Sequence, residues 1–456
     1  MLVVREKIHF FHTNDVHSHF ELWPRTQHYI RTQRTLLAEK DEPSFLFDIG
    51  DHLDRSNIYT EATVGKGNID MLNEAAYDVV TIGNNEGITL AFDDLYTLYD
   101  EAEFDVVIAN IQTLNGPNPA WLKPYTILTT KHGTKIGVVG ATAQYDAFYK
   151  ALNWVVSEPR IAIIQVVEML KEQVDIIVCL SHLGITEDEA LANECPEIDV
   201  IFGAHTHHIF EQGKMVNGVL LTGGGKFGHY TGHLTIEYDH ATNKIIKKDT
   251  LIENALLPST EDEAFYLQNK LIEAKAQLSK TEFTIYRTYH KEWFHYSQLS
   301  DLFAKAILEY TKADCAMFNA GILLGDLQKG HVSAYDIHRI LPHPINLCVM
   351  ELTGAELKEV YRQSKNEDWP NLQLKGLGFR GIVFGKMLTY NFAINENHEL
   401  IMNNKIVDLQ HTYTLVTLDM FTFGYFFPTF KYTKKEYHLP LFLRDILIQY
   451  GKVTFV

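Results

Sequence analysis

The sequence predicts a layered α/β domain followed by a second, mixed α/β domain. Over the first 250 residues short apolar runs alternate with amphipathic stretches, which is typical of strands and helices in layers. Residues 260–280 then form one long amphipathic stretch, acidic at its start and lysine-rich at its end, as the helix dipole favours. We therefore expect a first domain at 1–255, a linker helix at 256–281 and a second domain at 282–456.

The elements of the first domain follow from periodicity and from breaker residues. Pro24 opens a helix at its first turn, and the three prolines within 112–124 favour a loop. Alternating residues predict an antiparallel pair, and turn residues within 214–253 predict hairpins. Strands are expected at 7–12, 44–49, 78–82, 105–109, 125–130, 135–139 and 198–203, with another ending at His182; helices are expected at 24–40, 64–76, 89–102, 159–173 and 184–194, and in the second domain at 297–312 and 354–364.

Composition excludes several classes of protein. The chain has 456 residues, 46% of them hydrophobic, which suits two or three folded domains. A formal net charge of −18 argues against nucleic acid polymers and anionic membranes as partners. No apolar run approaches the ~20 residues that span a bilayer, and no secretory signal is visible, so we expect a cytoplasmic protein. The four cysteines form no CxxC pair and are expected to be reduced thiols.

Five apolar runs end in residues that bind metals. Strands of an α/β sheet stop on a common edge, and ligands bind in the crevice at their carboxyl ends. Seven oxygen and imidazole donors at that edge are enough for two divalent cations that share one carboxylate. The seven candidate ligands are Asp15, His17, Asp51, Asn84, His182, His205 and His207.

The candidate ligands have a definite chemical preference. Carboxylate, amide and imidazole donors without a thiolate suit Mn²⁺, Zn²⁺, Co²⁺ or Fe²⁺. Two such ions about 3.5–4 Å apart can bind a phosphoryl oxygen and activate a water as a nucleophile. Each residue alone is more often a turn residue or a satisfied histidine, but five strand ends would have to carry such residues by accident.

The motifs D-x-H, GDxxxxS, GN, SHLG and GAHTHH, in this order, resemble the 5′-nucleotidase branch of the calcineurin-like metallophosphoesterases. The resemblance implies a four-layer α/β/β/α sandwich as a dinuclear metallophosphoesterase domain, followed by a nucleotidase-type substrate domain. It implies that Asp15, His17 and His207 bind one metal, that Asp51 bridges to the second, and that Asn84, His182 and His205 complete it. A hydroxide activated by the metals would attack phosphorus.

One departure concerns catalysis. Family members usually read GNHEFD where this chain reads Gly83-Asn84-Asn85-Glu86-Gly87-Ile88, so Asn85 and Ile88 stand in place of a transition-state histidine and its aspartate. Asn85 could donate a neutral hydrogen bond to the phosphate. Another histidine could substitute, and the candidates are His52, His208 and His229. Alternatively, the leaving group needs no protonation, as in a pyrophosphate bond. We expect Asn85 and His182 to take part in catalysis.

Candidate substrate-binding residues in the second domain are fewer and less specific. The NAGI segment resembles a family motif but lacks its arginine, and KGLGFRG places an arginine among glycines that allow close approach. An aromatic stretch at 421–432 could stack on a base. The candidates are Asn319, Gly321, Phe379, Arg380, Phe421 and Phe423.

The sequence thus predicts a metal-dependent phosphoester hydrolase, most simply a 5′-nucleotidase that converts a nucleoside monophosphate to nucleoside and phosphate. The partner is a small phosphorylated metabolite, and the protein is expected to be a monomer or a weak homo-oligomer. Alternatives are a 2′,3′-cyclic-nucleotide phosphodiesterase and a nucleotide-sugar or dinucleotide pyrophosphatase. From another class comes a metal-binding pseudoenzyme that senses a nucleotide.

Overall fold

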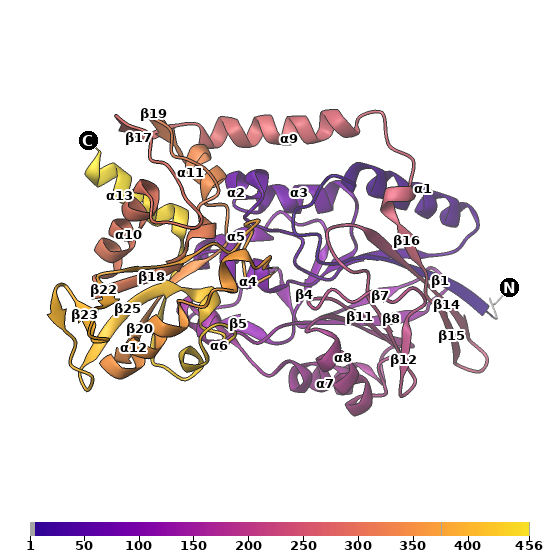
Figure 1. The fold of residues 1–456 in the computed structure, drawn as a ribbon. Helices are drawn as coiled ribbons and strands as arrows, with labels where there is room; N and C mark the ends of the chain where they lie inside the picture. Colours follow the sequence, from indigo (N-terminus) through magenta and orange to yellow (C-terminus); the bar gives the residue numbers. More distant parts are fainter. Residues whose placement is uncertain (1–4, 375, 456) are drawn as a thin grey trace. The chain divides into compact units, whose positions relative to one another are not determined.

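The computed structural model describes residues 5–374 and 376–455, which form two compact units divided between Glu273 and Ala274 (Figure 1). The division lies within helix α9 (Glu263–Leu278), the helix expected at 260–280. Each unit has its own sheets and its own core.

The first unit contains two large sheets. The first sheet runs in the order β15 (Lys244–Lys248), β14 (Tyr230–Asp239), β1 (Arg5–Thr13), β2 (Ser44–Asp48), β3 (Val79–Val80), β4 (Asp105–Val107) and β6 (Leu122–Lys123), with β16 (Leu251–Glu253) also paired to β14. The second runs β12 (Lys214–Val216), β13 (Val219–Thr222), β11 (Val200–Gly203), β10 (Ile176–His182), β8 (Lys135–Thr142) and β7 (Tyr125–Thr129). A short pair joins β5 (Ile111–Thr113) to β9 (Trp154–Val156).

The two sheets pack face to face around a shared apolar core. Phe47 of β2 and Phe202 of β11 are fully buried there, with ring centroids 5.6 Å apart. A second cluster joins the outer face of β8 and β10 to α7 (Pro159–Leu170) and α8 (Ile185–Glu194) through Ile163 and Leu191. On the opposite side lie α1 (Trp23–Glu39), α2 (Ile58–Thr63) and α3 (Lys66–Glu74) (Figure 1). These layers are α/β/β/α, so the predicted fold class is confirmed.

Most expected elements are present, and the antiparallel pairing of β7 with β8 is confirmed. Three expectations were wrong in detail. The helix expected at 64–76 is α3, which begins at Lys66 and ends at Glu74, and the helix before it, α2, was not expected. Val64 and Gly65 separate the two helices, since both have positive φ, 51° and 83°. The helix expected at 89–102 is shorter, α5 (Phe92–Leu98), because the backbone at Leu90 and Ala91 is extended. The loop expected at 112–124 contains β6 and part of β5, which are too short to show a period.

The second unit is built on a five-stranded mixed sheet. Its order is β21 (Met387–Tyr390), β18 (Cys315–Asn319), β25 (Thr412–Leu418), β20 (Asn346–Thr353) and β26 (Lys435–Phe442). Two smaller sheets pair β17 (Thr281–Ile285) with β19 (Gly330–Ser333) and β22 (Phe392–Ile394) with β23 (Leu400–Met402) and β24 (Lys405–Ile406). The helices are α10 (Gln298–Thr311), α11 (Ala334–Ile340), α12 (Gly354–Gln363) and α13 (Leu443–Thr454).

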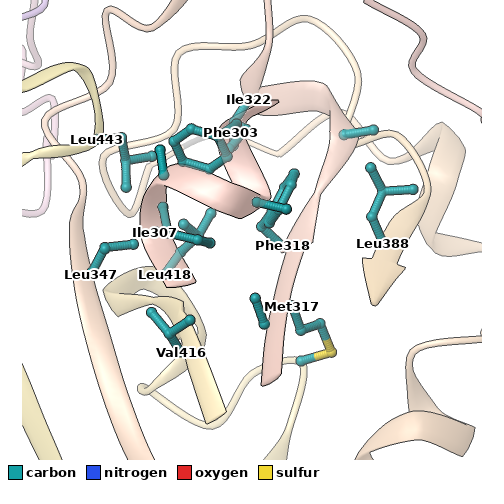
Figure 2. Packing of buried hydrophobic residues seen from close by; sticks show 14 of the residues in the cluster. Phe303, Ile307, Met317, Phe318, Ile322, Leu347, Leu388, Val416, Leu418 and Leu443 are labelled. Carbon is teal, nitrogen blue, oxygen red and sulfur yellow. The ribbon is translucent and has the colours of Figure 1, made fainter. Parts of the chain in front are cut away.

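Helix α10 packs on this sheet through its apolar face. Phe303 and Ile307 from the helix lie against Phe318 of β18 and Leu418 of β25 (Figure 2). The rings of Phe303 and Phe318 meet edge to face with centroids 5.0 Å apart. The second unit therefore has an independent core that can position its own loops.

Two expectations from composition can be compared with the structure. All four cysteines are free and buried, in agreement with the expected reduced thiols. Among the helices in the described residues, none combines the length and the apolar character needed to cross a membrane.

Candidate metal centre

The candidate ligands lie at the carboxyl ends of neighbouring parallel strands. Strands β1, β2 and β3 pair in parallel in one sheet, and β10 pairs in parallel with β11 in the other. The loops after β1 and β2 carry Asp15, His17 and Asp51, while Asn84 begins α4 (Asn84–Thr89) just beyond β3. In the other sheet His182 ends β10, and His205 and His207 follow β11.

Five of these side chains gather into two groups that share one carboxylate. Asp15, His17 and His207 form the first group, and Asp15, Asp51 and His182 form the second; within each group the ligand atoms lie within 4.8 Å of one another. In the first group, Nε2 of His207 lies 3.4 Å from both Nε2 of His17 and Oδ1 of Asp15. The two oxygens of Asp51 face different groups, since Oδ1 lies 3.4 Å from His182 Nε2 and Oδ2 lies 3.7 Å from His17 Nε2.

His182 is held in the orientation that a ligand needs. Its Nδ1 donates a hydrogen bond to the carbonyl oxygen of Ile49 across 2.7 Å, which leaves Nε2 facing the carboxylates as the atom that can bind a metal. Burial by itself lowers the pKa of His182, but the charges of Asp51 and Asp15 outweigh it and raise the pKa to about 10. In the same way His182 overcomes the burial of Asp51 and holds the pKa of that carboxyl below its usual range.

Asn84 and His205 border these groups. The side-chain oxygen of Asn84 is buried and has no hydrogen-bond partner within the described residues. The backbone nitrogen of His205 donates to Asp15 Oδ2 at 3.1 Å, and its ring lies 5.2 Å from that of His182, centroid to centroid. Its Nε2 faces the hydroxyl of Tyr145 at 3.4 Å. Six of the seven candidate ligands therefore lie in or beside one cluster, and Asn84 directly precedes Asn85, whose backbone nitrogen donates to Asp51.

The backbone of the ligand loops is strained. Five candidate ligands have positive φ, which is uncommon for residues with a side chain: Asp15 (49°), His17 (48°), Asp51 (52°), His205 (72°) and His207 (58°). Such conformations cost on the order of 1–3 kcal/mol each and persist where the surrounding structure imposes them. Here they occur in the loops that follow β1, β2 and β11.

The donor set fits divalent cations. Without an ion, the carboxylates of Asp15 and Asp51 are buried beside histidines whose ligating nitrogens face one another. Nε2 of His182 and Oδ1 of Asn84 are buried polar atoms without a hydrogen-bond partner in the described part of the chain, a state that proteins normally avoid. Cations held by these oxygens and nitrogens would satisfy both atoms. Imidazole with carboxylate suits Mn²⁺, Zn²⁺, Co²⁺ or Fe²⁺.

Two supporting residues of this cluster were not identified from the sequence. Asn14 is buried and donates to Asp15 Oδ2 at 2.8 Å and to the carbonyl oxygen of Gly225 at 2.8 Å. Glu86 accepts hydrogen bonds from the backbone nitrogens of Asp51, Leu53 and Gly83. Both residues stand next to a ligand motif, which was the only signal in the sequence. Most of their hydrogen-bond partners are distant in sequence, so their supporting role could not be predicted.

The residues considered as substitutes for the missing histidine lie apart from one another. His52 is buried next to Asp51 in the loop that follows β2, and its Nδ1 contacts Asn68 Nδ2 at 3.2 Å. His208 is exposed and contacts the hydroxyl of Thr206 at 2.8 Å, and His229 is exposed. Asn85 itself is buried, and its amide nitrogen contacts His17 Nδ1 at 2.8 Å.

In the second unit, three of the candidate substrate-binding residues occupy adjoining segments. Asn319 ends β18, and its amide donates to the carbonyl oxygen of Phe384 at 2.7 Å. Gly321 lies so close to residues 383–384 that an added Cβ would come within 2.0 Å of the Val383 carbonyl oxygen. Arg380 is half-buried and donates to the carbonyl oxygen of Phe379 at 3.2 Å.

The three aromatic candidates of this unit differ in accessibility. Phe379 is buried and stacks on His343, with centroids 5.3 Å apart and planes at 4°. Phe421 is fully buried in the core, whereas 44% of the Phe423 residue surface is exposed. Of the three, Phe423 alone presents its ring without a rearrangement.

Comparison with known proteins finds relatives over nearly the whole chain. Residues 8–208 match the family model "Calcineurin-like phosphoesterase", and residues 275–431 match "5′-nucleotidase, C-terminal domain". The "Uncharacterized metallophosphoesterase YunD" of Bacillus subtilis is 42% identical over 457 residues, covering 97% of this chain and 99% of that protein.

Two solved structures share the fold. A putative 5′-nucleotidase from Staphylococcus aureus, in complex with alpha-ketoglutarate, superposes with a TM-score of 0.71 at 18% identity, covering 99% of this chain and 98% of that one. The NAD nucleotidase of Haemophilus influenzae superposes with a TM-score of 0.67 at 15% identity, covering 99% and 97%.

Proposed function

Because this chain belongs to the calcineurin-like phosphoesterases that carry a 5′-nucleotidase C-terminal domain, we propose that it hydrolyses nucleoside monophosphates to nucleoside and phosphate. The chain is a metallophosphoesterase of the 5′-nucleotidase family, as the sequence motifs predicted. The proposal concerns the substrate, the metals and the roles of individual residues.

The observation that carries the proposal is the convergence of candidate ligands from the ends of β1, β2, β10 and β11 on one buried cluster. The cluster contains two groups of ligand atoms joined through Asp15, and Asp51 faces both groups. Two cations sharing a carboxylate are the arrangement used for in-line displacement at phosphorus. A single ion would leave one of the two groups without a cation.

Each side chain then has a defined task. Asp15, His17 and His207 would hold one divalent cation, while Asn84, His182 and His205 would hold the second, with Asp51 reaching both. When bound, the cations would stabilise charge on the phosphoryl oxygens and lower the pKa of a bound water. The hydrogen bond from His182 to Ile49 and the hydrogen bond from Asn14 to Asp15 hold His182 and Asp15 in place before the substrate binds.

Recognition of the nucleoside is assigned to the second unit. Phe423 presents an exposed ring that can stack on a base, and Arg380 is the candidate for a phosphate or ribose contact. The two superposed structures are named as a 5′-nucleotidase and as an NAD nucleotidase, and both names agree with a nucleotide as substrate.

The test is a substrate panel on metal-depleted protein reconstituted with Mn²⁺, Zn²⁺, Co²⁺ or Fe²⁺. Release of phosphate would be measured from nucleoside 5′-monophosphates, with glycerol phosphate as an ester that lacks a base. We expect metal-dependent turnover that is faster for the nucleotides. Full metal binding without turnover of any phosphate compound would contradict the proposal and favour a nucleotide-sensing pseudoenzyme.

One observation favours a second candidate substrate class. Asn85 cannot supply the proton or the positive charge of a histidine, help that is worth about 10²–10⁴-fold in rate. A pyrophosphate bond depends less on that help, because its phosphate leaving group is already stable. Nucleotide sugars and dinucleotides therefore belong in the same panel, together with 2′,3′-cyclic nucleotides as the other alternative, and faster hydrolysis of any of these would replace the monophosphate proposal.

A further inference from the structure

Asn85 occupies the centre of a small hydrogen-bond network. The residue is 8% exposed and is the second residue of α4. Its side-chain nitrogen lies 2.8 Å from Nδ1 of His17 and donates to the carbonyl oxygen of Leu53 at 3.2 Å. Its side-chain oxygen accepts from Nδ2 of Asn84 at 3.4 Å. The nitrogen and the oxygen of the amide therefore both contact the protein.

The backbone of Asn85 makes a further contact with a candidate ligand. Its nitrogen donates to Oδ1 of Asp51 at 2.7 Å, and this is the oxygen that faces His182. Asn85 thus touches Asp51, His17 and Asn84, which are candidate ligands for both cations.

The contact with Asn84 has a directional consequence. Because Nδ2 of Asn84 is turned toward Asn85, its Oδ1 points away from that amide, and this oxygen is buried without a hydrogen-bond partner in the described chain. The oxygen is the atom that a divalent cation prefers. The neighbouring amide therefore selects which end of Asn84 is offered to the metal.

The contact with His17 fixes the ring of a second ligand. Nε2 of His17 faces Asp15, Asp51 and His207, so Nδ1 is the atom available for an orienting partner. Two side chains face this nitrogen, the amide of Asn85 at 2.8 Å and Oδ2 of Asp54 at 3.7 Å. Asn85 is the nearer of the two and so restricts rotation of the ring.

We propose that Asn85 is a positioning residue that holds His17, Asn84 and Asp51 for the two cations and does not contact the phosphate. The proposal rests on the proposed function, since it assigns those three residues to the metals. A histidine at this position would lack the support it has in relatives, because Ile88 has no polar atom to orient it. Asn85 and Ile88 therefore go together: a histidine that would contact the substrate, with its aspartate, is replaced by an asparagine that supports the metal ligands.

The test measures metal binding, which does not depend on turnover. Mn²⁺ binding to the full-length, metal-depleted protein would be followed by calorimetry, and the visible spectrum of bound Co²⁺ would report ligand geometry. Asn85→Ala is expected to weaken metal binding by about 10–100-fold, the usual effect of removing an outer-shell partner, and to change the Co²⁺ spectrum. Asn85→Asp, which keeps acceptors for Asn84 and for His17, is expected to bind more tightly than Asn85→Ala.

Asn110→Ala is the matched control. Asn110 is also a buried amide that donates and accepts, bonding to the backbone of Thr142 and Ser157, and it touches no candidate ligand. Both alanine variants are expected to lower the unfolding temperature of the metal-free protein. Asn110→Ala is expected to keep wild-type metal affinity, which separates positioning from general destabilisation.

Two results would overturn the proposal. One is Asn85→Ala binding both metals with wild-type affinity while turnover falls, because Asn85 would then act on the substrate. The other is Asn85→His raising turnover with unchanged metal affinity. Wild-type protein that binds two metals but hydrolyses no phosphate compound would refute the proposed function, while weaker binding by Asn85→Ala would still support positioning.

Discussion

The carboxylate of Glu86 accepts a hydrogen bond from the backbone nitrogen of Asp51 across 3.0 Å and so joins α4 to the loop that follows β2. The same carboxylate accepts from the backbone nitrogens of Gly83 at 2.8 Å and Leu53 at 3.0 Å. Burial, with repulsion from Asp51, raises the pKa of Glu86 to about 7. One buried side chain therefore holds the backbone on both sides of a candidate bridging ligand.

Replacing Glu86 by glutamine tests this support. An amide has one acceptor oxygen, so at least one of the three backbone N–H groups would face an NH₂ group. We expect the free energy of unfolding to fall by roughly 1–3 kcal/mol, the usual cost of an unsatisfied buried donor. Metal binding should weaken as well. Glu253→Gln, at an exposed position, is the control, and equal unfolding midpoints in urea for the two variants would refute the role.

Asp48, the last residue of β2, and Asp51, in the loop that follows, form a matched pair of variants for a test of metal binding. Asp51 faces His182 and His17, whereas Asp48 is buried against the Thr13 hydroxyl at 2.6 Å and the Gly50 nitrogen at 3.0 Å. Burial raises the pKa of Asp48 well above its usual range, so a neutral amide can replace it. Asp51→Asn is expected to lose bound metal and at least about 100-fold in turnover. Asp48→Asn is expected to keep both, as elemental analysis and phosphate release would show.

The aromatic segment of the second unit offers another pair. Removing the exposed ring in Phe423→Ala is expected to raise KM for a nucleotide by roughly 10–100-fold, since stacking on a base is worth ~1–3 kcal/mol. The unfolding temperature should not change. Removing the fully buried ring in Phe421→Ala is expected to destabilise the protein by about 3–5 kcal/mol. If Phe423→Ala leaves KM unchanged for every nucleotide, the base binds elsewhere.

Asp419 predicts a pH-dependent stability. This carboxyl is buried, accepts from the Asn346 nitrogen at 3.0 Å, and has a pKa raised by burial from 3.8 to about 7. The folded state therefore holds a proton that the unfolded chain releases near pH 4, and the stability from this group is lost as pH rises toward 7. In Asp419→Asn the amide oxygen can still accept from Asn346, but no proton is released.

We expect the free energy of unfolding of Asp419→Asn to exceed that of wild type by an amount that grows from pH 4 to pH 7 and then levels off. The scale is about 1.4 kcal/mol for each unit of pKa shift. Urea unfolding at pH 5, 6, 7 and 8 would measure the difference, with the exposed Asp408→Asn as control. Parallel curves for wild type and Asp419→Asn would show that Asp419 is ionised in the folded protein across this range.

Local sequence was sufficient for the layered fold and for the position of the candidate ligands along the chain. Strands such as β2 and β10 are short apolar runs, and the period of two and the flanking breakers are local properties. Asp51 and His182 stand at or just past the ends of such runs, so their place at a sheet edge follows from the strand alone. Helix α2 was missed because its six residues are too few to show a helical period.

The sequence by itself therefore determined the set of candidate metal ligands. The tertiary structure decided which of them lie close enough to share a metal. Asp15 joins the two groups, Asn85 bonds to His17, and Glu86 supports Asp51 because loops from different strands close on one another. In the second unit the structure buries Phe379 and Phe421 and exposes Phe423, a choice that core packing makes among equally apolar rings. Hydrogen bonds and burial between distant segments depend on packing in three dimensions, and no local pattern encodes them.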